Sequence, residues 1–77
     1  MLKFKLGDVL KMQNEKHLVK VIDTEYKLFG PDLQVYTLEF ISGPLIGTKY
    51  FEEAEQVDKT YTIATRTERV LYGSTEK

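Results

Sequence analysis

Histidine and cysteine, the residue types most often found in metal and nucleophile sites, are almost absent from this chain. His17 is the only histidine and there is no cysteine, so neither a histidine-based metal cluster, a Ser-His-Asp triad nor a thiolate site is supported. A lone histidine at the start of a strand is typical of a surface position. We therefore predict no catalytic residue and no metal ligand at His17.

An acidic run is the second place where chemistry could occur. Glu52, Glu53, Glu55 and Asp58 could offer carboxylate oxygens to a hard cation. The run lacks the glycine and the alternating spacing of a calcium-binding loop. We interpret it as a solvated acidic turn.

A glycine-rich segment, Ser42-Gly43-Pro44-Leu45-Ile46-Gly47, is the nearest approach to a phosphate-binding loop. No Lys-Ser or Lys-Thr pair and no helix follows it, so it is better explained as a hairpin turn. General acid–base pairs also need a cleft, and a small barrel is filled by its own side chains. We expect no enzymatic activity and no cofactor.

Alternating and β-branched residues predict the elements that would position these groups. Strands are expected at residues 2–12 with a bend at Gly7-Asp8, and at 17–26, 34–42, 48–51 and 61–65. Residues 52–57 predict one helical turn. The sequence therefore predicts an all-β fold, a small five-stranded barrel with a short helical turn before the last strand, because closure removes exposed strand edges. Residues 1–65 would form the single domain and 66–77 a polar C-terminal extension.

Length and composition limit what such a chain can be. Its 77 residues, 42% hydrophobic and 30% charged, suffice for one modest core. No apolar run approaches the roughly 20 residues that span a bilayer, and the first six residues alternate polar with apolar. We expect a cytoplasmic protein with no membrane partner. The net charge of -1 disfavours nonspecific nucleic-acid binding, although residues 1–30 hold six lysines against four acids.

The segment Phe4-Lys5-Leu6-Gly7-Asp8-Val9-Leu10 resembles the start of SH3-like small β-barrels of the KOW and Tudor kind. The strands that follow, including residues 19–22, 36–40 and 61–63, occur in a similar order, so the resemblance spans roughly residues 3–65. It implies the barrel fold. The glycine expected in the first loop of a KOW segment is missing from residues 13–16, and no binding residue is transferred.

Nine aromatic residues must divide between core and surface. Core positions are expected for Phe4, Tyr36, Phe40, Phe51 and Tyr61. Tyr26, Phe29, Tyr50 and Tyr72 are candidates for a contact surface, since aromatic rings give large contact area at low entropic cost. Phe29 and the pair Leu45-Ile46 lie in Gly-Pro loops, where large apolar groups have little structural reason to be.

These features lead to one main functional hypothesis and two alternatives. The first is a small non-catalytic module that binds another protein, an adaptor or inhibitor such as phages and mobile elements often encode. Its candidate partner-binding residues are Phe29, Tyr26, Leu45, Ile46, Tyr50, Glu52 and Glu53. The second is a nucleic-acid-binding barrel that uses Lys3, Lys5, Lys11 and Lys20 on one outer face. The third is a self-assembling structural subunit, a homo-oligomer that pairs edge strands.

Overall fold

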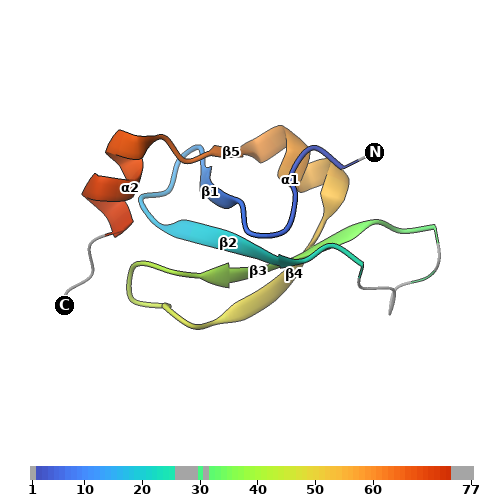
Figure 1. Cartoon of the computed structure of the whole chain (residues 1–77). Coiled ribbons are helices and arrows are strands. Elements are labelled where there is room, and N and C mark those ends of the chain that lie inside the picture. Colours follow the sequence, from blue (N-terminus) through green and yellow to red (C-terminus); the bar gives the residue numbers. More distant parts are fainter. Residues whose placement is uncertain (1, 26–29, 31, 74–77) are drawn as a thin grey trace.

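The computed structural model describes residues 2–25, 30 and 32–73, and within them five antiparallel strands form one sheet. The elements in chain order are β1 (Val9–Met12), β2 (Leu18–Asp23), β3 (Val35–Phe40), β4 (Lys49–Glu53), α1 (Ala54–Thr60), β5 (Tyr61–Ile63) and α2 (Arg66–Gly73). The strand order is β4-β3-β2-β1-β5 (Figure 1). Five strands and a helical segment before the last strand are thus confirmed.

The sheet is open rather than closed into a barrel. β4 and β5 are its two edges, and no pairing joins them in the described part of the chain. The seven-residue helix α1 separates these two strands in the sequence, and β5 has only three residues. The gap is bridged by side chains instead of by a backbone ladder. The fold is therefore mostly sheet with two short helices, and the barrel closure expected from the sequence is not found.

The core lies on one face of the sheet. Leu10, Val19, Val21, Tyr36 and Leu38 point to this inner face and are at most 3% exposed. The registers Leu10↔Val19↔Phe40 and Val21↔Leu38↔Tyr50 place these side chains in rows across the strands. Alternation within the strands thus determines which residues fill the interior.

One end of the core is closed by segments outside the sheet. Phe4 from the N-terminal segment and Ala54 and Val57 from α1 are buried against the inner face. The Tyr36 hydroxyl accepts a hydrogen bond from the Phe4 backbone N–H (3.0 Å) and donates one to Asp58 Oδ1 (3.0 Å). A single phenol therefore connects the N-terminal segment, β3 and α1.

Residues 2–8 do not form the first half of a bent strand, so that expectation is wrong. The Asp8 carboxylate accepts a hydrogen bond from the Lys5 N–H (2.9 Å), and the Asp8 N–H bonds to the Lys5 carbonyl (3.0 Å). These bonds close a tight turn just before β1. The two-residue period is lost there, and Leu6, expected beside Phe4, is 65% exposed.

The C-terminal segment contains a helix that the strand patterns did not predict. Thr65 and Glu68 bond reciprocally: the Thr65 N–H donates to Glu68 Oε1 (2.9 Å) and the Glu68 N–H donates to Thr65 Oγ1 (3.1 Å). This capping box starts α2. The helix contacts β2, and the Lys11 ammonium lies 5.7 Å from the centroid of the Tyr72 ring. Leu18, paired with Lys11, is 1% exposed although it does not belong to the inner cluster. We infer that α2 covers Leu18 on the outer face.

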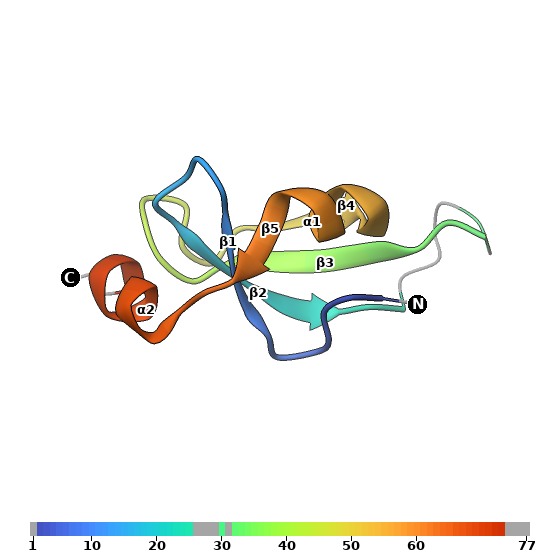
Figure 2. The same cartoon turned by 90° about the horizontal axis from the view of Figure 1, so that it is seen from above.

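Figures 1 and 2 place α2, the β1–β2 turn and the β3–β4 turn at one end of the molecule, with α1 set away from that end. Because α1 and Phe4 close the core only at their own end, the inner face of the sheet is left open at the end that carries the two turns.

Candidate functional site

A groove opens at this end of the inner face. It is lined by Met12, Glu15, His17, Val19, Phe40, Leu45, Tyr50 and Tyr61, and its volume is about 260 Å³. The lining comes from all five strands or from the turns between them. Most of it is apolar, and its charged and titratable groups lie in the β1–β2 turn or belong to the tyrosines.

Aromatic rings form one wall of the groove. The rings of Phe40 and Tyr50 pack with their centroids 5.2 Å apart and their planes tilted by 33°. Met12 is partly buried and Val19 is fully buried beside them. Such tilted aromatic packing helps to fix the rings in place and adds to the stability gained from their burial. The wall is therefore held in position before any ligand arrives.

Tyr50 and Tyr61 meet across the gap between the two edge strands. Their hydroxyl oxygens are 2.7 Å apart, so one hydroxyl donates a hydrogen bond to the other. Burial is the main cause that raises the pKa of Tyr50 and of Tyr61, and the Glu52 carboxylate raises both further. Both phenols therefore stay protonated at neutral pH and serve as a fixed hydrogen-bonding pair rather than as a base or nucleophile.

The β3–β4 turn forms one rim. The Gly47 N–H bonds to the Phe40 carbonyl (2.8 Å) and the Thr48 N–H to the Leu45 carbonyl (2.9 Å). These bonds hold Leu45 and Ile46 outward at 52% and 54% exposure. Two large apolar side chains are thus presented to solvent by an ordered turn.

The β1–β2 turn forms the opposite rim and packs on the first. A Cβ atom added at Gly43 would lie less than 3.0 Å from three atoms of the His17 ring, so the imidazole sits directly on the Gly43 backbone. The buried Ser42 hydroxyl accepts a hydrogen bond from the Leu18 N–H (2.8 Å). The two rims are therefore tied together, and Glu15 is exposed beside them.

The structure gathers some of the predicted partner-binding residues and separates others. Leu45 and Tyr50 line the groove, and Ile46 lies next to it in the turn. Glu52 and Glu53 line a second, shallower depression with Leu33, Val35 and Phe51. Tyr26 and Phe29 lie outside the described residues.

The positions of Phe51 and Tyr50 differ from a simple division into core and surface aromatics. Phe51, predicted to fill the core, is 47% exposed because β4 turns it to the outer face with Lys49 and Glu53. Tyr50, a candidate for the contact surface, packs against the core and also lines the groove. Sequence reasoning also missed Met12, Glu15, His17, Val19, Phe40 and Tyr61 as groove residues. No local signal marks them, since they converge only in the folded chain.

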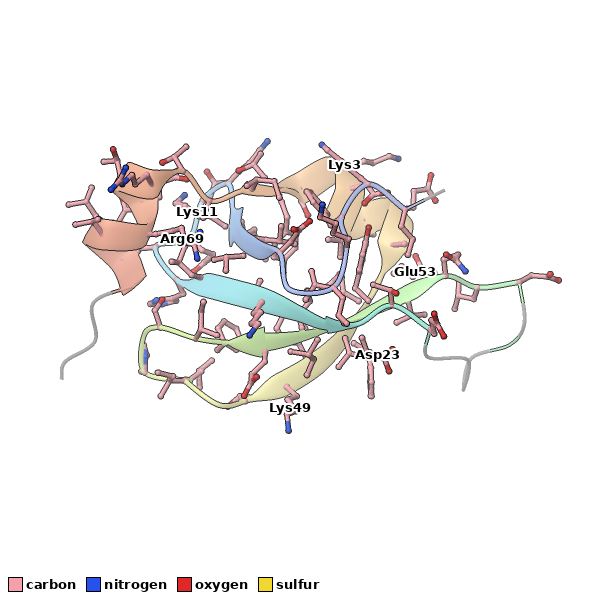
Figure 3. The ribbon with its side chains drawn as sticks, in the orientation of Figure 1. Lys3, Lys11, Asp23, Lys49, Glu53 and Arg69 are labelled. Carbon is pink, nitrogen blue, oxygen red and sulfur yellow. The ribbon has the colours of Figure 1, made fainter. Side chains whose placement is uncertain are left out.

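Of the four lysines proposed for nucleic acid, Lys11 and Lys20 lie on the same outer face of the sheet, and Lys3 lies apart from them. Lys3 donates to the Asp58 carbonyl (3.3 Å) beside α1, whereas Lys11 points at α2 (Figure 3). Lys20 is exposed on β2, where its cross-strand neighbours are Val9 on β1 and Glu39 on β3. Lys5 is exposed in the turn before β1.

The acidic run is used in structural contacts. Glu55 forms an ion pair with Lys59 (3.4 Å) along α1, and Asp58 accepts the bond from Tyr36. Across residues 2–25, 30 and 32–73, no group of three or more His, Cys, Asp or Glu side chains is arranged to hold a metal ion. Neither α1 nor α2, the helices described, has the length and hydropathy that a bilayer crossing requires.

Comparison of the chain with protein-family models, with curated proteins and with solved structures finds no significant match. The groove and its surroundings are therefore the features from which a function can be inferred.

Proposed function

We propose that this protein is a small non-catalytic binding module that holds an exposed apolar segment of another polypeptide chain in the groove. The observation that carries the proposal is the groove itself, an ordered, mostly apolar hollow whose rim presents Leu45 and Ile46 to solvent. Exposed apolar surface marks interaction sites where it is contiguous, as at the adjacent Leu45 and Ile46 beside the apolar groove.

The chemistry of the lining supports binding over catalysis. A volume of about 260 Å³ lies below the 300–1,000 Å³ that is common for sites holding a small-molecule substrate or cofactor. The raised pKa values of Tyr50 and Tyr61 keep both hydroxyls protonated. Catalysis by proton transfer works best with a group whose pKa lies near the working pH, and these phenols are far from that.

The fold adds a second part to the proposal. The order β4-β3-β2-β1-β5, with a short helix between β4 and β5, supports the relationship to SH3-like small barrels that the Gly7-Asp8 region suggested. This relationship would explain a strongly curved sheet with one binding end. It carries no assignment of partner.

A site-specific crosslinking experiment tests the binding function. A photoreactive phenylalanine analogue at position 46 lies at the rim of the groove, whereas the same analogue at position 6 is exposed elsewhere. We expect position 46, and not position 6, to crosslink to a polypeptide in an extract of the source cells, and Leu45→Glu to abolish that product. Equal labelling from both positions, or none from position 46, would contradict the proposal.

Nucleic-acid binding is a second candidate with one observation in its favour. Lys11 points at α2, and that helix carries Arg66 and Arg69, so three cationic side chains belong to one end of the molecule (Figure 3). Titration of labelled single- and double-stranded oligonucleotides at low salt tests this candidate. Binding that is lost in Arg69→Ala but kept in Leu45→Glu would favour it over the groove.

A further inference from the structure

The groove and α2 are complementary surfaces at the same end of one molecule. Val70 and Leu71 are 69% and 63% exposed on α2. Together with Leu45 and Ile46 they make four of the seven large apolar side chains found exposed in the described part of the chain. Their elements, α2 and the β3–β4 turn, lie at the same end in both cartoon views (Figures 1 and 2).

We propose that the groove of one molecule receives α2 of a second copy, and that the second copy's groove receives α2 of the first. The inference rests on the proposed function in that it uses the same groove and names its occupant. A two-fold axis relates the copies, because a groove and a helix at the same end can be exchanged reciprocally.

The faces of α2 fit this arrangement. Tyr72 faces the sheet under Lys11, which fixes the helix rotation. At about 100° per residue, Val70 then lies on the opposite side of the helix and Leu71 beside it. Val70 is thus directed away from its own sheet and Leu71 to the side, and the described part of the chain leaves both exposed.

Charge favours the same pairing. Glu15 lines the groove, and Glu52 lies near enough to raise the pKa of both Tyr50 and Tyr61. Arg66 and Arg69 are both exposed on α2. By the same rotation Arg66 lies about 40° around the helix from Val70, whereas Arg69 lies toward the side of Tyr72. Arg66 therefore brings positive charge, beside Val70, to an apolar groove whose lining includes the Glu15 carboxylate.

The size of the groove suits side chains rather than a large ligand. About 260 Å³ accommodates one or two aliphatic side chains, and the fixed Phe40–Tyr50 wall gives them a rigid surface. Only a few anchors contribute on each side, so the interface is small. We expect a weak dimer, with a dissociation constant on the order of 10–100 μM.

Sedimentation equilibrium of the full chain from about 10 μM to 1 mM provides the first test. The wild type should change from the 9.0 kDa monomer to twice that mass. Leu45→Glu and Val70→Glu should each weaken the dimer at least tenfold, while Leu6→Glu, a matched change at a leucine exposed elsewhere, should leave it intact. A wild type that stays monomeric to 1 mM overturns the inference, as does a dimer that Leu45→Glu and Val70→Glu leave unchanged.

Mixing the two variants provides the second test. Val70→Glu keeps its groove and Leu45→Glu keeps its helix, so the mixture can form one intact groove–helix contact. Adding unlabelled Leu45→Glu to ¹⁵N-labelled Val70→Glu should shift the amide resonances of Met12, Tyr50 and Tyr61. If each residue instead met its own copy across the axis, both contacts in the mixture would carry a glutamate, no shift would occur, and the inference would be overturned.

The outcomes separate this inference from the function proposed above. A monomer whose position-46 probe still crosslinks to a different polypeptide refutes the second-copy occupant and keeps the binding function. A dimer that behaves as described, with crosslinking from position 46 only to a second copy, supports the inference and restricts the function to self-association.

Discussion

The hydroxyl oxygens of Tyr50 and Tyr61 lie 2.7 Å apart and join β4 to β5, the two edge strands of the sheet. No backbone ladder links these strands in the part of the chain described, so the phenol pair is a bridge between the edges. It also forms part of the groove, which connects the stability of the sheet to the shape of the binding site.

The losses of stability caused by removing the two hydroxyls of this bridge should be non-additive. Tyr50→Phe or Tyr61→Phe leaves one partly buried hydroxyl without its partner, and each should lower the free energy of unfolding by about 1–2 kcal/mol. The double variant removes both polar groups and should cost clearly less than the sum. Urea unfolding of the four proteins measures the coupling. Costs that add up would mean that the hydrogen bond contributes nothing.

The two bridge tyrosines, together with Tyr36, predict a loss of stability at high pH. Burial raises the pKa of Tyr50, Tyr61 and Tyr36 above 10.0, so the unfolded chain releases these protons first. Their contribution is complete below about pH 10 and declines as pH rises further, by at most about 1.4 kcal/mol per pH unit for each tyrosine. Urea midpoints between pH 8 and 11 check this. The decline should be shallower in the Tyr50→Phe/Tyr61→Phe double variant, and a flat profile would refute the prediction.

Tyr36 should anchor the N-terminal segment. Tyr36→Phe removes the bond that the Phe4 N–H donates and the bond to Asp58, and should lower stability by about 2 kcal/mol. The Phe4 amide should exchange with solvent much faster, which hydrogen exchange measures directly. Thr62→Ser, on the exposed face of β5, is a control that should alter neither quantity. Unchanged protection of Phe4 in Tyr36→Phe would contradict the anchoring role.

Gly43 and Gly47 form a matched pair for testing the rim of the groove. Both have left-handed backbone, with φ of +83° and +90°, but only a Cβ at Gly43 would collide with the His17 ring. Gly47→Ala should cost about 1–2 kcal/mol from backbone strain alone. Gly43→Ala should cost more, and the excess should vanish in a His17→Ala background. Thermal unfolding measures all four variants; equal costs for the two glycines would show that the imidazole does not pack there.

Helix α2 should contribute to the stability of the sheet. Truncation after Thr65 would expose Leu18 and remove the contact between Lys11 and Tyr72, so we expect a loss of about 2 kcal/mol. Urea unfolding of the truncated and full chains measures it, with truncation after Gly73 as the control. An unchanged midpoint would support the prediction from sequence that residues 66–77 are only an extension of a domain ending at 65.

Local sequence patterns determined most of the strands of this protein. Alternation and β-branched residues identified the strands around Val21, Leu38 and Tyr61, because these preferences act within a few residues. The capping box of Thr65 and Glu68 was also readable, as its spacing of three residues is local. Apolar periodicity does not indicate this helix because the segment is polar.

Tertiary structure decided which further residues join Leu45 and Tyr50 in the site. Whether Phe51 faces the core or solvent depends on the register in which β4 pairs with β3. Leu6 is exposed because the Lys5–Asp8 turn interrupts the two-residue alternation of a strand. The groove needs Met12, Phe40 and Tyr61, which lie up to 49 residues apart and meet only when the sheet curves and α1 closes the opposite end. Local propensity has no information about contacts of that range, since their geometry arises from packing of the whole chain.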